Sequence, residues 1–595
     1  MQICRLLIRN FRGIKSGVIN IEGNSVLVGD NNSGKSTIFE AIDLVMGPDR
    51  LSKRPVIDEH DFYAGEYIVD GEPVEISIEV TVIDLNDNQL RHFGNYIEWW
   101  DKTNITLLEG PPASETDRES VIPALRLTFK GGYDPEEDDF YGQSFYAITI
   151  GDSKQAVKFT TKDKRNCGFL YLRTLRTGSR ALSLEKGSLL DVILQLREVR
   201  PRMWENTLEQ LKSVVVATDP DLGIDDILTS VQESISTIVA YESGEAPRMR
   251  VSSLTREHLR KILTVFLGTG SKDSKGNEYA TPYYNQGTGT INTLVLTLLS
   301  MIAEMKDSVI FAMEEPEIAL PPHIQKRSII SVMEHSNQAL FTSHSPYVIE
   351  ELPSDHVLVV SRKDGLLKAV PAKMPPIVKS KAYRDEIRRR FCEALLSRRV
   401  IITEGKTEYD VYTTAARKLQ KLHPEKNLSF ELLGIAPVNA ESDSKIAELG
   451  IYYKKLNKTV YAVFDKQEGE SLNKIAQAVD YFFEGSEHGI EKEVLNGVSD
   501  EVLVRYGLYL VDEGAWPVNL QSIKPHEKMT AEEIYSSLFK YFTGHKGDGA
   551  LADFIEYCSE NELPEFIVKT IYDISETIYR QNDTECEINN SVVEE

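Results

Sequence analysis

Hydrophobic and polar positions alternate at the start of the chain in the manner of β-strands. Residues 3–8 and 18–21 are typical of a short antiparallel strand pair, and Ser25-Val26-Leu27-Val28 is a third, more apolar strand. A glycine-rich stretch follows, and apolar side chains then recur at helical spacing. These side chains are Ile38, Ala41, Ile42 and Val45. The pattern predicts a strand, a glycine turn and a helix in direct succession.

Later changes of pattern predict two further segments. Residues 188–265 are helical in character and poor in strand signals, which indicates a helical element inserted into a larger domain. Prolines between 371 and 376 mark a linker. After it come a strand at 400–402, a helix over 409–422 and a strand at 460–464. This alternation predicts a second α/β domain with a parallel sheet.

Composition narrows the class of protein. The 595 residues include 67 Lys and Arg against 92 Asp and Glu, so the net charge is −25, and 41% of the residues are hydrophobic. Such a chain can build sizeable cores, and its acidity disfavours general coating of polyanions while leaving room for a local basic surface. No run of about 18 apolar residues is present, so no membrane span is expected. The five scattered cysteines are typical of reduced thiols in a cytoplasmic protein without a zinc site.

A phosphate-binding loop is the strongest chemical signal. Gly29–Ser36 satisfies the pattern G-x4-G-K-[ST] between a predicted strand and a predicted helix. Backbone N–H groups of such a loop surround the β-phosphate, Lys35 neutralises β- and γ-oxygens, and the Ser36 hydroxyl is placed for Mg²⁺. We therefore expect ATP to be the cofactor. The residues predicted to bind it are Asn31, Asn32, Ser33, Gly34, Lys35, Ser36 and Thr37.

Three later motifs supply partners for this loop. An apolar strand at 309–313 ends in Glu314-Glu315; one carboxylate, Glu314, is expected to hold Mg²⁺ and the other, Glu315, to orient the attacking water. His344 follows another strand, in the position of a γ-phosphate sensor. Gly287 and Gly289 open a helix whose N–H groups are free for a second phosphate. A lone histidine after a strand is more often structural, but the combination favours a functional site.

This set resembles the ATP-binding-cassette ATPases of the structural-maintenance-of-chromosomes type. In that likeness residues 29–36 are the Walker A loop, Glu314-Glu315 ends Walker B, residues 287–289 occupy the signature position and His344 is the switch histidine. The resemblance implies a homodimer in which the signature of one protomer faces the Walker A loop of the other. Two departures are visible: Glu314 replaces the usual Asp, and the signature is short and poor in serine.

A second set of carboxylates lies in the predicted C-terminal domain. Glu404 and Glu408 are four residues apart around a glycine turn, and Asp465 ends the strand at 460–464. Carboxylates that converge from adjacent parallel strands suit Mg²⁺ or Mn²⁺. The alternative is an ordinary solvated helix start, which the helix dipole favours in any case.

An ATPase followed by E-G-x-x-E and a strand ending in Asp resembles the OLD (overcoming lysogenization defect) family of ATP-dependent nucleases. The likeness implies an α/β protein, with an ABC-type P-loop ATPase whose helical insert mediates dimerisation, followed by a Toprim domain. The predicted boundaries are 1–187 and 266–375 for the two ATPase parts, 188–265 for the insert and 376–595 for the Toprim domain.

The same resemblance implies roles for individual residues. Glu404 and Glu408 match the first Toprim motif, and Asp465 matches the first Asp of D-x-D. Gln467 stands where the second Asp is expected, with Glu468 as a possible substitute. A later acid is also expected, which leaves Glu491, Asp512 and Glu513 open, and Lys546 matches the family's C-terminal lysine unless it is an exposed loop lysine.

The partners follow from this likeness and from one basic cluster. Between 379 and 399 eight basic residues stand against three acidic ones, which predicts either a local DNA-binding surface or a solvated helical face. The family resemblance implies a DNA endonuclease or nickase in bacterial defence against phage, a homodimer or higher homo-oligomer, and a possible helicase or retron partner. The alternative is a dimeric ATPase switch whose impaired Toprim domain serves as a sensor or scaffold.

Overall fold

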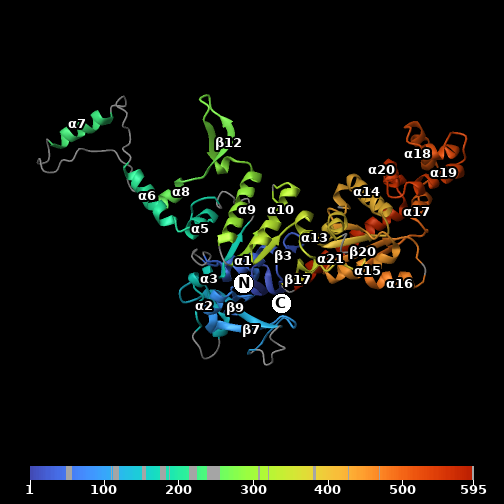
Figure 1. The fold of residues 1–595 in the computed structure, drawn as a ribbon. Helices are drawn as coiled ribbons and strands as arrows, with labels where there is room; N and C mark the ends of the chain where they lie inside the picture. Colours follow the sequence, from blue (N-terminus) through green and yellow to red (C-terminus); the bar gives the residue numbers. More distant parts are fainter. Residues whose placement is uncertain are drawn as a thin grey trace. The chain divides into compact units, whose positions relative to one another are not determined.

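The computed structural model describes most of the chain (Figure 1). The described residues are 1–48, 56–108, 110–111, 120–150, 156–173, 182–185, 188–213, 224–236, 255–305, 308–318, 320–378, 383–426, 428–467 and 469–591. They form two compact units. The first comprises residues 1–4, 39–58 and 78–341, and the second comprises residues 5–38, 59–77 and 342–595.

The first unit contains two groups of adjacent strands. One has the order β6 (Ile76–Ile83), β9 (Val121–Asp134), β7 (Ile97–Asp101) and β8 (Thr106–Leu108), and β10 (Asp139–Tyr146) pairs with β9. The other has the order β11 (Phe169–Leu172), β14 (Ile310–Glu314) and β15 (Gln338–Thr342). β11 and β14 are parallel, and β14 is buried from Ile310 to Met313. An almost wholly apolar sequence is what a parallel strand covered on both faces requires.

Helices of the first unit bear out the helical pattern of the predicted insert. The helices in that segment are α5 (Leu189–Leu196), α6 (Arg200–Ser213), α7 (Ile224–Ser236) and α8 (Arg256–Ile262). They are followed by the hairpin of β12 (Phe266–Lys272) and β13 (Glu278–Pro282), and then by α9 (Thr288–Met305) and α10 (Pro322–His335). The role of the insert in dimerisation and the four domain boundaries stay predictions.

Among the described residues, helix α9 alone is long and apolar enough to cross a membrane. It packs against α5 and α10 and buries Val295, Leu299 and Ile302. Core helices of this kind pass the same length and composition test, so the helix is weak evidence for a membrane span.

The second unit begins with the predicted strand pair. β1 (Gln2–Phe11) and β2 (Ile14–Asn20) are antiparallel, and β3 (Ser25–Val28) is fully buried. β16 (Val357–Lys363) lies parallel to β3 and antiparallel to β17 (Leu366–Pro371). Six residues separate the end of β3 from the start of the helix α1 (Lys35–Met46), so the predicted order of strand, glycine turn and helix is confirmed.

The C-terminal part of the second unit is built on a parallel sheet, as the sequence predicts. Its strands have the order β19 (Ile435–Asn439), β18 (Arg399–Thr403), β20 (Thr459–Phe464) and β21 (Tyr481–Glu484). Figure 1 shows α14 (Lys406–Leu422) on one side of this sheet and α15 (Ile446–Lys455) and α16 (Glu470–Ala478) on the other. Since β18 comes first in the chain and lies between β19 and β20, the direction of winding reverses between β18 and β20.

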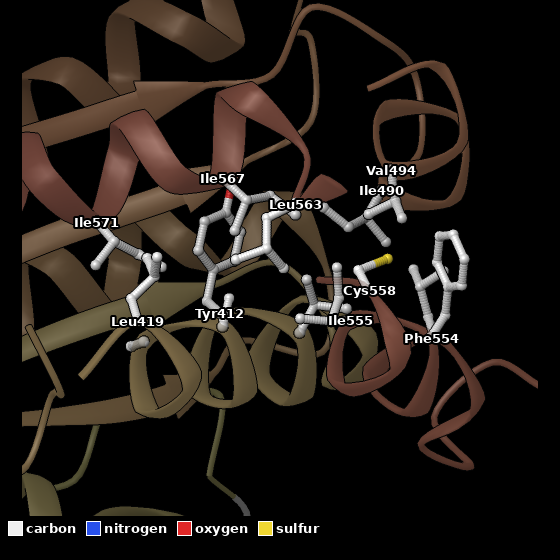
Figure 2. Packing of buried hydrophobic residues seen from close by; sticks show 14 of the residues in the cluster. Tyr412, Leu419, Ile490, Val494, Phe554, Ile555, Cys558, Leu563, Ile567 and Ile571 are labelled. Carbon is white, nitrogen blue, oxygen red and sulfur yellow. The ribbon is translucent and has the colours of Figure 1, made fainter. Parts of the chain in front are cut away.

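Helices α20 (Ala550–Tyr557) and α21 (Glu565–Ser591) pack against α14 (Figure 2). Helices α17 (Ile490–Asn496), α18 (Asp500–Asp512) and α19 (Ala531–Gly544) contribute to the same hydrophobic core. Tyr412 and Leu419 of α14 lie against Ile567 and Ile571 of α21, and all four side chains are buried. This core fixes α14, and with it the loop that joins β18 to α14.

Replacing Ile571 by alanine should lower the free energy of unfolding by about 2–5 kcal/mol, because Ile571 is fully buried and the surrounding helices cannot collapse completely around the cavity. Denaturation in urea measures the change. The matched control is Ile451→Ala, since Ile451 lies on α15 and is 49% exposed. Equal losses in the two variants would contradict the packing described here.

Candidate functional site

The phosphate-binding loop has the backbone that its glycines predict. Gly29 and Gly34 have φ angles of 143° and 100°. A Cβ atom on Gly29 would lie 2.4 Å from the carbonyl oxygen of Val360 in the neighbouring strand, so no larger residue fits there. The ammonium of Lys35 is buried and donates to the carbonyl oxygens of Gly29 and Asp30, both at 2.9 Å. Lys35 is therefore folded over the loop whose phosphates it is predicted to neutralise.

The other predicted nucleotide residues of the second unit have varied exposure. Asn31, Asn32 and Ser36 are exposed, Thr37 is half-buried and Ser33 is buried. His344 is half-buried in the turn between β15 and α11 (Pro346–Ile349), where the predicted sensor position lies. These positions agree with the predicted roles without testing them.

The first unit carries the remaining ATPase motifs. Glu314 ends β14, and the hydroxyl of Tyr171 in β11 donates a 2.8 Å hydrogen bond to its Oε1. Glu315 follows with a φ of 45°, a conformation that is costly for a residue other than glycine and is common at functional sites. Gly287 directly precedes α9, and Gly289 is its second residue. The sequence did not predict Tyr171, because its bond to Glu314 spans 143 positions.

Arginines of the basic cluster between 379 and 399 make contacts with other residues of the chain. Arg384 pairs with Glu351 at 2.9 Å, and Arg388 pairs with Glu350 at 2.5 Å. Arg390 lies 2.8 Å from Glu386 and 3.3 Å from Glu441, and Arg398 pairs with Asp30 of the phosphate-binding loop. Arg399 donates to the carbonyl oxygen of Leu433. These arginines make ion pairs and hydrogen bonds within the chain, and the use of the cluster for DNA stays a prediction. Lys379 and Lys381 lie outside the described residues.

The carboxylates of the second set converge at the carboxyl edge of the four-stranded sheet. Glu404 follows β18, Asp465 follows β20, and the backbone N–H of Asp465 donates to Oε2 of Glu404 at 3.3 Å. Glu408, in the first turn of α14, is buried. These three residues lie at the reversal between β18 and β20, which is where open α/β sheets bind ligands. The predicted convergence is therefore present.

Burial and the proximity of several carboxylates raise pKa values in this cluster. Burial, and after it the charges of Glu408, Glu404 and Glu491, together raise the pKa of Asp465 to about 7. Burial also raises the pKa of Glu404 and of Glu408. Besides burial, repulsion between neighbouring carboxylates raises these pKa values, because the groups cannot all be ionised at once. A bound cation at this edge of the sheet would reduce the repulsion.

Two residues left open by the sequence complete the cluster. Glu491, at the start of α17, is 2% exposed, and its Oε1 lies 3.1 Å from the ammonium of Lys546. The loop that carries Lys546 is held by Gly547, whose N–H donates to the Thr407 hydroxyl at 3.2 Å and whose carbonyl accepts a hydrogen bond from Lys406. Lys546 therefore lies beside the carboxylates.

Of the three candidate acids, Glu491 is the one that joins the cluster. Asp512 and Glu513 are exposed at the end of α18 and are not among the charges that raise the pKa of Asp465. Gly489, which directly precedes α17, has a φ of 106°, a backbone conformation that favours glycine. Nothing in the spacing of the sequence distinguishes the three acids.

The side chain of Gln467, which stands in place of the second Asp, is held by hydrogen bonds to other protein groups. Its Nε2 donates to the carbonyl oxygen of Asp465 at 3.3 Å, and its Oε1 accepts from Ser471 at 3.2 Å. Its backbone N–H donates to Glu484 at the end of β21. Glu468, the possible substitute, lies outside the described residues.

The donor set fits a hard divalent cation. Glu404, Glu408, Asp465 and Glu491 offer only carboxylate oxygens, which Mg²⁺ and Mn²⁺ prefer. The raised pKa values of Glu404, Glu408 and Asp465 indicate that negative charge is crowded here. Across the part of the chain that the structure describes, no three His, Cys, Asp or Glu side chains already stand in coordinating positions. Side-chain rotation would therefore have to accompany metal binding.

The predicted ATPase part of the chain is similar to a known protein family. Residues 1–177 and 190–349 match the family described as AAA ATPase domain, which is more than half of the chain. The chain belongs to the AAA ATPase domain family. Membership confirms the predicted P-loop ATPase fold and the assignment to an ATPase class of enzyme, while the residues that contact the nucleotide stay predictions.

Three curated relatives extend beyond the AAA ATPase domain. The chain is 22% identical to the OLD nuclease of Thermus scotoductus over 432 residues, covering 67% of this chain and 71% of that protein. It is 21% identical to endonuclease GajA of Bacillus cereus, covering 72% and 69%, and 21% identical to the Old nuclease of Escherichia phage P2, covering 72% of each chain. The resemblance to OLD nucleases that the motifs indicated is confirmed.

Solved structures of SMC heads are also similar in part. The SmcHead bound to the C-winged helix domain of ScpA is 14% identical, with a TM-score of 0.34 over 62% of this chain and 98% of that one. The SMC head domain from Thermotoga maritima is 12% identical, with a TM-score of 0.29 over 63% and 100%. TM-scores this low do not establish a shared arrangement.

Replacing Tyr171 by phenylalanine should raise the Mg²⁺ concentration needed for half-maximal ATP hydrolysis by about tenfold, as is common when the partner of a metal ligand is lost. The reason is that Glu314, the predicted Mg²⁺ ligand, loses the hydroxyl that orients its Oε1. Titration of hydrolysis against Mg²⁺ measures the change. Tyr279→Phe, at a residue that is 57% exposed, is the control. An unchanged Mg²⁺ requirement would separate Tyr171 from the metal.

The raised pKa of Asp465 predicts a pH-dependent stability. The folded protein holds this proton up to about pH 7, whereas the unfolded chain releases it near the ordinary value of 3.8. The stabilising effect of protonation is therefore complete below the unfolded pKa and is lost as the pH rises through about 7. In EDTA, Asp465→Asn should gain stability over wild type between pH 5 and pH 8, measured by thermal unfolding. A gap that narrows with rising pH would contradict the crowding of this cluster.

Proposed function

We propose that the chain is an ATP-regulated, metal-dependent DNA endonuclease or nickase of the OLD type, acting in defence against phage. The observation that carries this proposal is the convergence of Glu404, Glu408, Asp465 and Glu491 at the reversal point of a parallel sheet. The three relatives, each named a nuclease, support it.

The carboxylates would hold the metal, and their neighbours would manage charge. Glu404, Glu408 and Asp465 are the proposed Mg²⁺ or Mn²⁺ ligands, with Glu491 as a fourth acid. The cation, when bound, would supply Lewis acidity at the scissile phosphate. Lys546, whose side chain is 60% exposed while its ammonium pairs with Glu491, is placed to offset the charge that develops on the phosphate.

The ATPase part is proposed to act as a homodimer. Gly287 and Gly289 of one protomer would face the phosphate-binding loop of the other, Glu314 would hold Mg²⁺, Glu315 would orient water and His344 would sense the γ-phosphate. Arg398, from the start of the four-stranded sheet region, pairs with Asp30 of that loop, which gives the two chemistries a direct physical link. A helicase or a retron remains a proposed partner, and the cytoplasm the proposed compartment.

One observation favours a second candidate function. Gln467 is held by backbone and Ser471 contacts instead of facing the carboxylates, which weakens the expected metal site. On this alternative the chain is an ATPase switch whose C-terminal domain acts as a sensor or scaffold. A protein of this kind would bind ATP and nucleic acid but would never cut a plasmid with any divalent metal.

Replacing Glu404 by alanine should lower plasmid nicking by at least ~10²-fold, the scale on which the loss of a main electrostatic stabiliser acts. ATP hydrolysis should remain, because Glu404 belongs to the four-stranded sheet region and not to the phosphate-binding loop. The assay follows the conversion of supercoiled to open-circle DNA with Mg²⁺ or Mn²⁺, with and without ATP.

The control for this prediction is Glu470→Ala, because the Glu470 side chain is 84% exposed at the start of α16. Normal nicking by Glu404→Ala would refute the proposed site. If wild type itself never cuts DNA under any of these conditions, the scaffold function replaces the nuclease.

A further inference from the structure

A cavity of about 280 Å³ lies in the second unit, at the β19 side of the four-stranded sheet. It is bounded by the π-helical turn at Ile387–Phe391, by α13 (Cys392–Leu396), by the first turn of α14 and by the end of β19. Its lining residues are Arg388, Arg390, Cys392, Glu393, Lys406, Tyr409, Pro437, Asn439 and Glu441. The cavity is not the carboxylate cluster, but Lys406, the first residue of α14, is only two positions from Glu404 in the chain.

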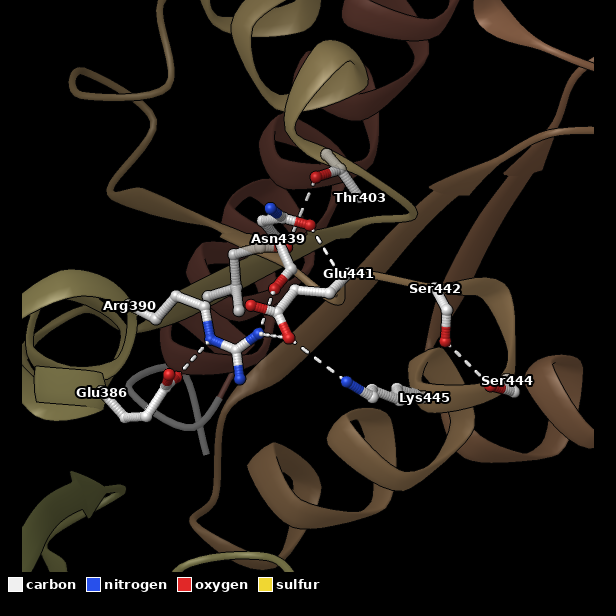
Figure 3. A network of polar contacts seen from close by, with 9 residues as sticks. Glu386, Arg390, Thr403, Asn439, Glu441, Ser442, Ser444 and Lys445 are labelled. Atoms are coloured by element: carbon white, nitrogen blue, oxygen red, sulfur yellow. Dashed lines mark hydrogen bonds and ion pairs between the residues drawn. The ribbon is translucent and has the colours of Figure 1, made fainter. Parts of the chain in front are cut away.

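Two ion pairs and a hydrogen bond hold the Arg390 side chain of this cavity in a fixed position (Figure 3). Nε of Arg390 lies 2.8 Å from Glu386, and its Nη1 donates to the carbonyl oxygen of Asn439 at 3.1 Å and lies 3.3 Å from Glu441. The Arg390 side chain is only 8% exposed. A guanidinium immobilised in this way loses little further entropy when it binds an anion.

Several donors at the cavity are not used by these contacts. Within the described residues, Nη2 of Arg390 makes no hydrogen bond, and neither does Nδ2 of Asn439, whose Oδ1 accepts from the N–H of Glu441 at 2.7 Å. The Tyr409 hydroxyl, which also lines the cavity, has no hydrogen-bond partner among the described residues. A ligand rich in acceptor oxygens satisfies donors of this kind.

The lining also has a flat apolar element. Tyr409 is half-buried on α14, one turn from Lys406, so a ring lies near a cation at one wall of the cavity. A phosphate has negative oxygens for the cations and amide, and a nucleobase has a π-face for the ring. The position at the carboxyl edge of a parallel sheet is typical of ligand sites in α/β domains.

We propose that this cavity binds one nucleotide unit, with its phosphate on Arg390, Asn439 and Lys406 and its base against Tyr409. The unit comes either from a DNA strand that follows the sheet edge or from a free nucleotide, since both have the same chemistry. The inference rests on the proposed function in so far as the domain acts on nucleic acid, and it adds the place where a nucleotide beside the carboxylates is held.

The test uses a substitution that changes charge but not shape. Asn439→Asp keeps the oxygen that accepts from Glu441 and replaces the unused amide donor by a carboxylate oxygen. Affinity for a nucleotide unit should fall at least about tenfold, because a charged hydrogen bond is lost and a repulsive contact replaces it. Asn473→Asp, on the exposed side of α16, adds the same charge away from the cavity and is the control.

A second variant examines the base. Tyr409→Leu keeps an apolar side chain of moderate size but removes the ring, so affinity should fall severalfold through lost stacking. Tyr409→Phe retains the ring and should lose less. These variants also keep the test decisive if Asn439→Asp fails to fold.

Binding is measured on the full-length chain in EDTA, so that no strand is cut, and in a Lys35→Ala background, so that the phosphate-binding loop does not capture the probe. The probes are a fluorescent single-stranded oligonucleotide and dAMP. A loss of oligonucleotide affinity in Asn439→Asp and Tyr409→Leu, but not in Asn473→Asp, supports a DNA strand as the source. Saturable dAMP binding with the same losses, and unchanged oligonucleotide affinity, supports a free nucleotide.

The cavity proposal is overturned if the wild-type protein binds neither probe more tightly than the variants do, or if neither probe binds at all. This outcome is independent of the nuclease proposal. A protein that binds in EDTA but never cuts with metal refutes the nuclease and leaves the cavity assignment standing. A protein that cuts normally with Asn439→Asp and binds both probes normally refutes the cavity alone.

Discussion

Repulsion among buried carboxylates at the carboxyl edge of the four-stranded sheet is the constraint on which the proposed chemistry depends. Asp465 would ionise near pH 4 in water, yet burial and three neighbouring acids raise its pKa to about 7. A fold keeps such a group only if other contacts hold it, since the charged form destabilises the protein above that pKa. Here the packing of α14 under α21 and the pair between Lys546 and Glu491 do so.

Local sequence patterns were enough to predict much of the fold and part of the candidate site. The phosphate-binding loop lies between β3 and α1 because its glycines, its apolar strand and its helical spacing are all contained in about twenty residues. Glu404 and Asp465 likewise follow directly after apolar parallel strands, so the alternation of strand and helix was enough to place both at one edge. In each case the deciding contacts are short in sequence or follow from sheet topology.

Other features of the site depend on pairings that no local pattern encodes. Tyr171 meets Glu314 across 143 positions, and Lys546 meets Glu491 through a loop held on the β18–α14 turn. The choice of Glu491 over Asp512 and Glu513 depends on where α17 packs, which the spacing of acids cannot specify. The cavity beside β19 is likewise formed by three segments that are separate in the sequence.

The arginine-rich segment shows why a count of charges is a poor guide to a binding surface. The ion pairs of this segment differ in how much they contribute to the stability of the fold. Arg398 and Asp30 are 64% and 36% exposed, and pairs as open as this contribute little to stability. Arg388 reaches Glu350, whose side chain is fully buried, and Arg390 is itself buried between Glu386 and Glu441. Removing one partner of a buried pair leaves an unpaired charge, which costs far more than the pair gains. Arg388 and Arg390 are therefore the residues that fix this segment, and because they also line the cavity, the contacts that hold the fold here are the same contacts that orient the cations toward it.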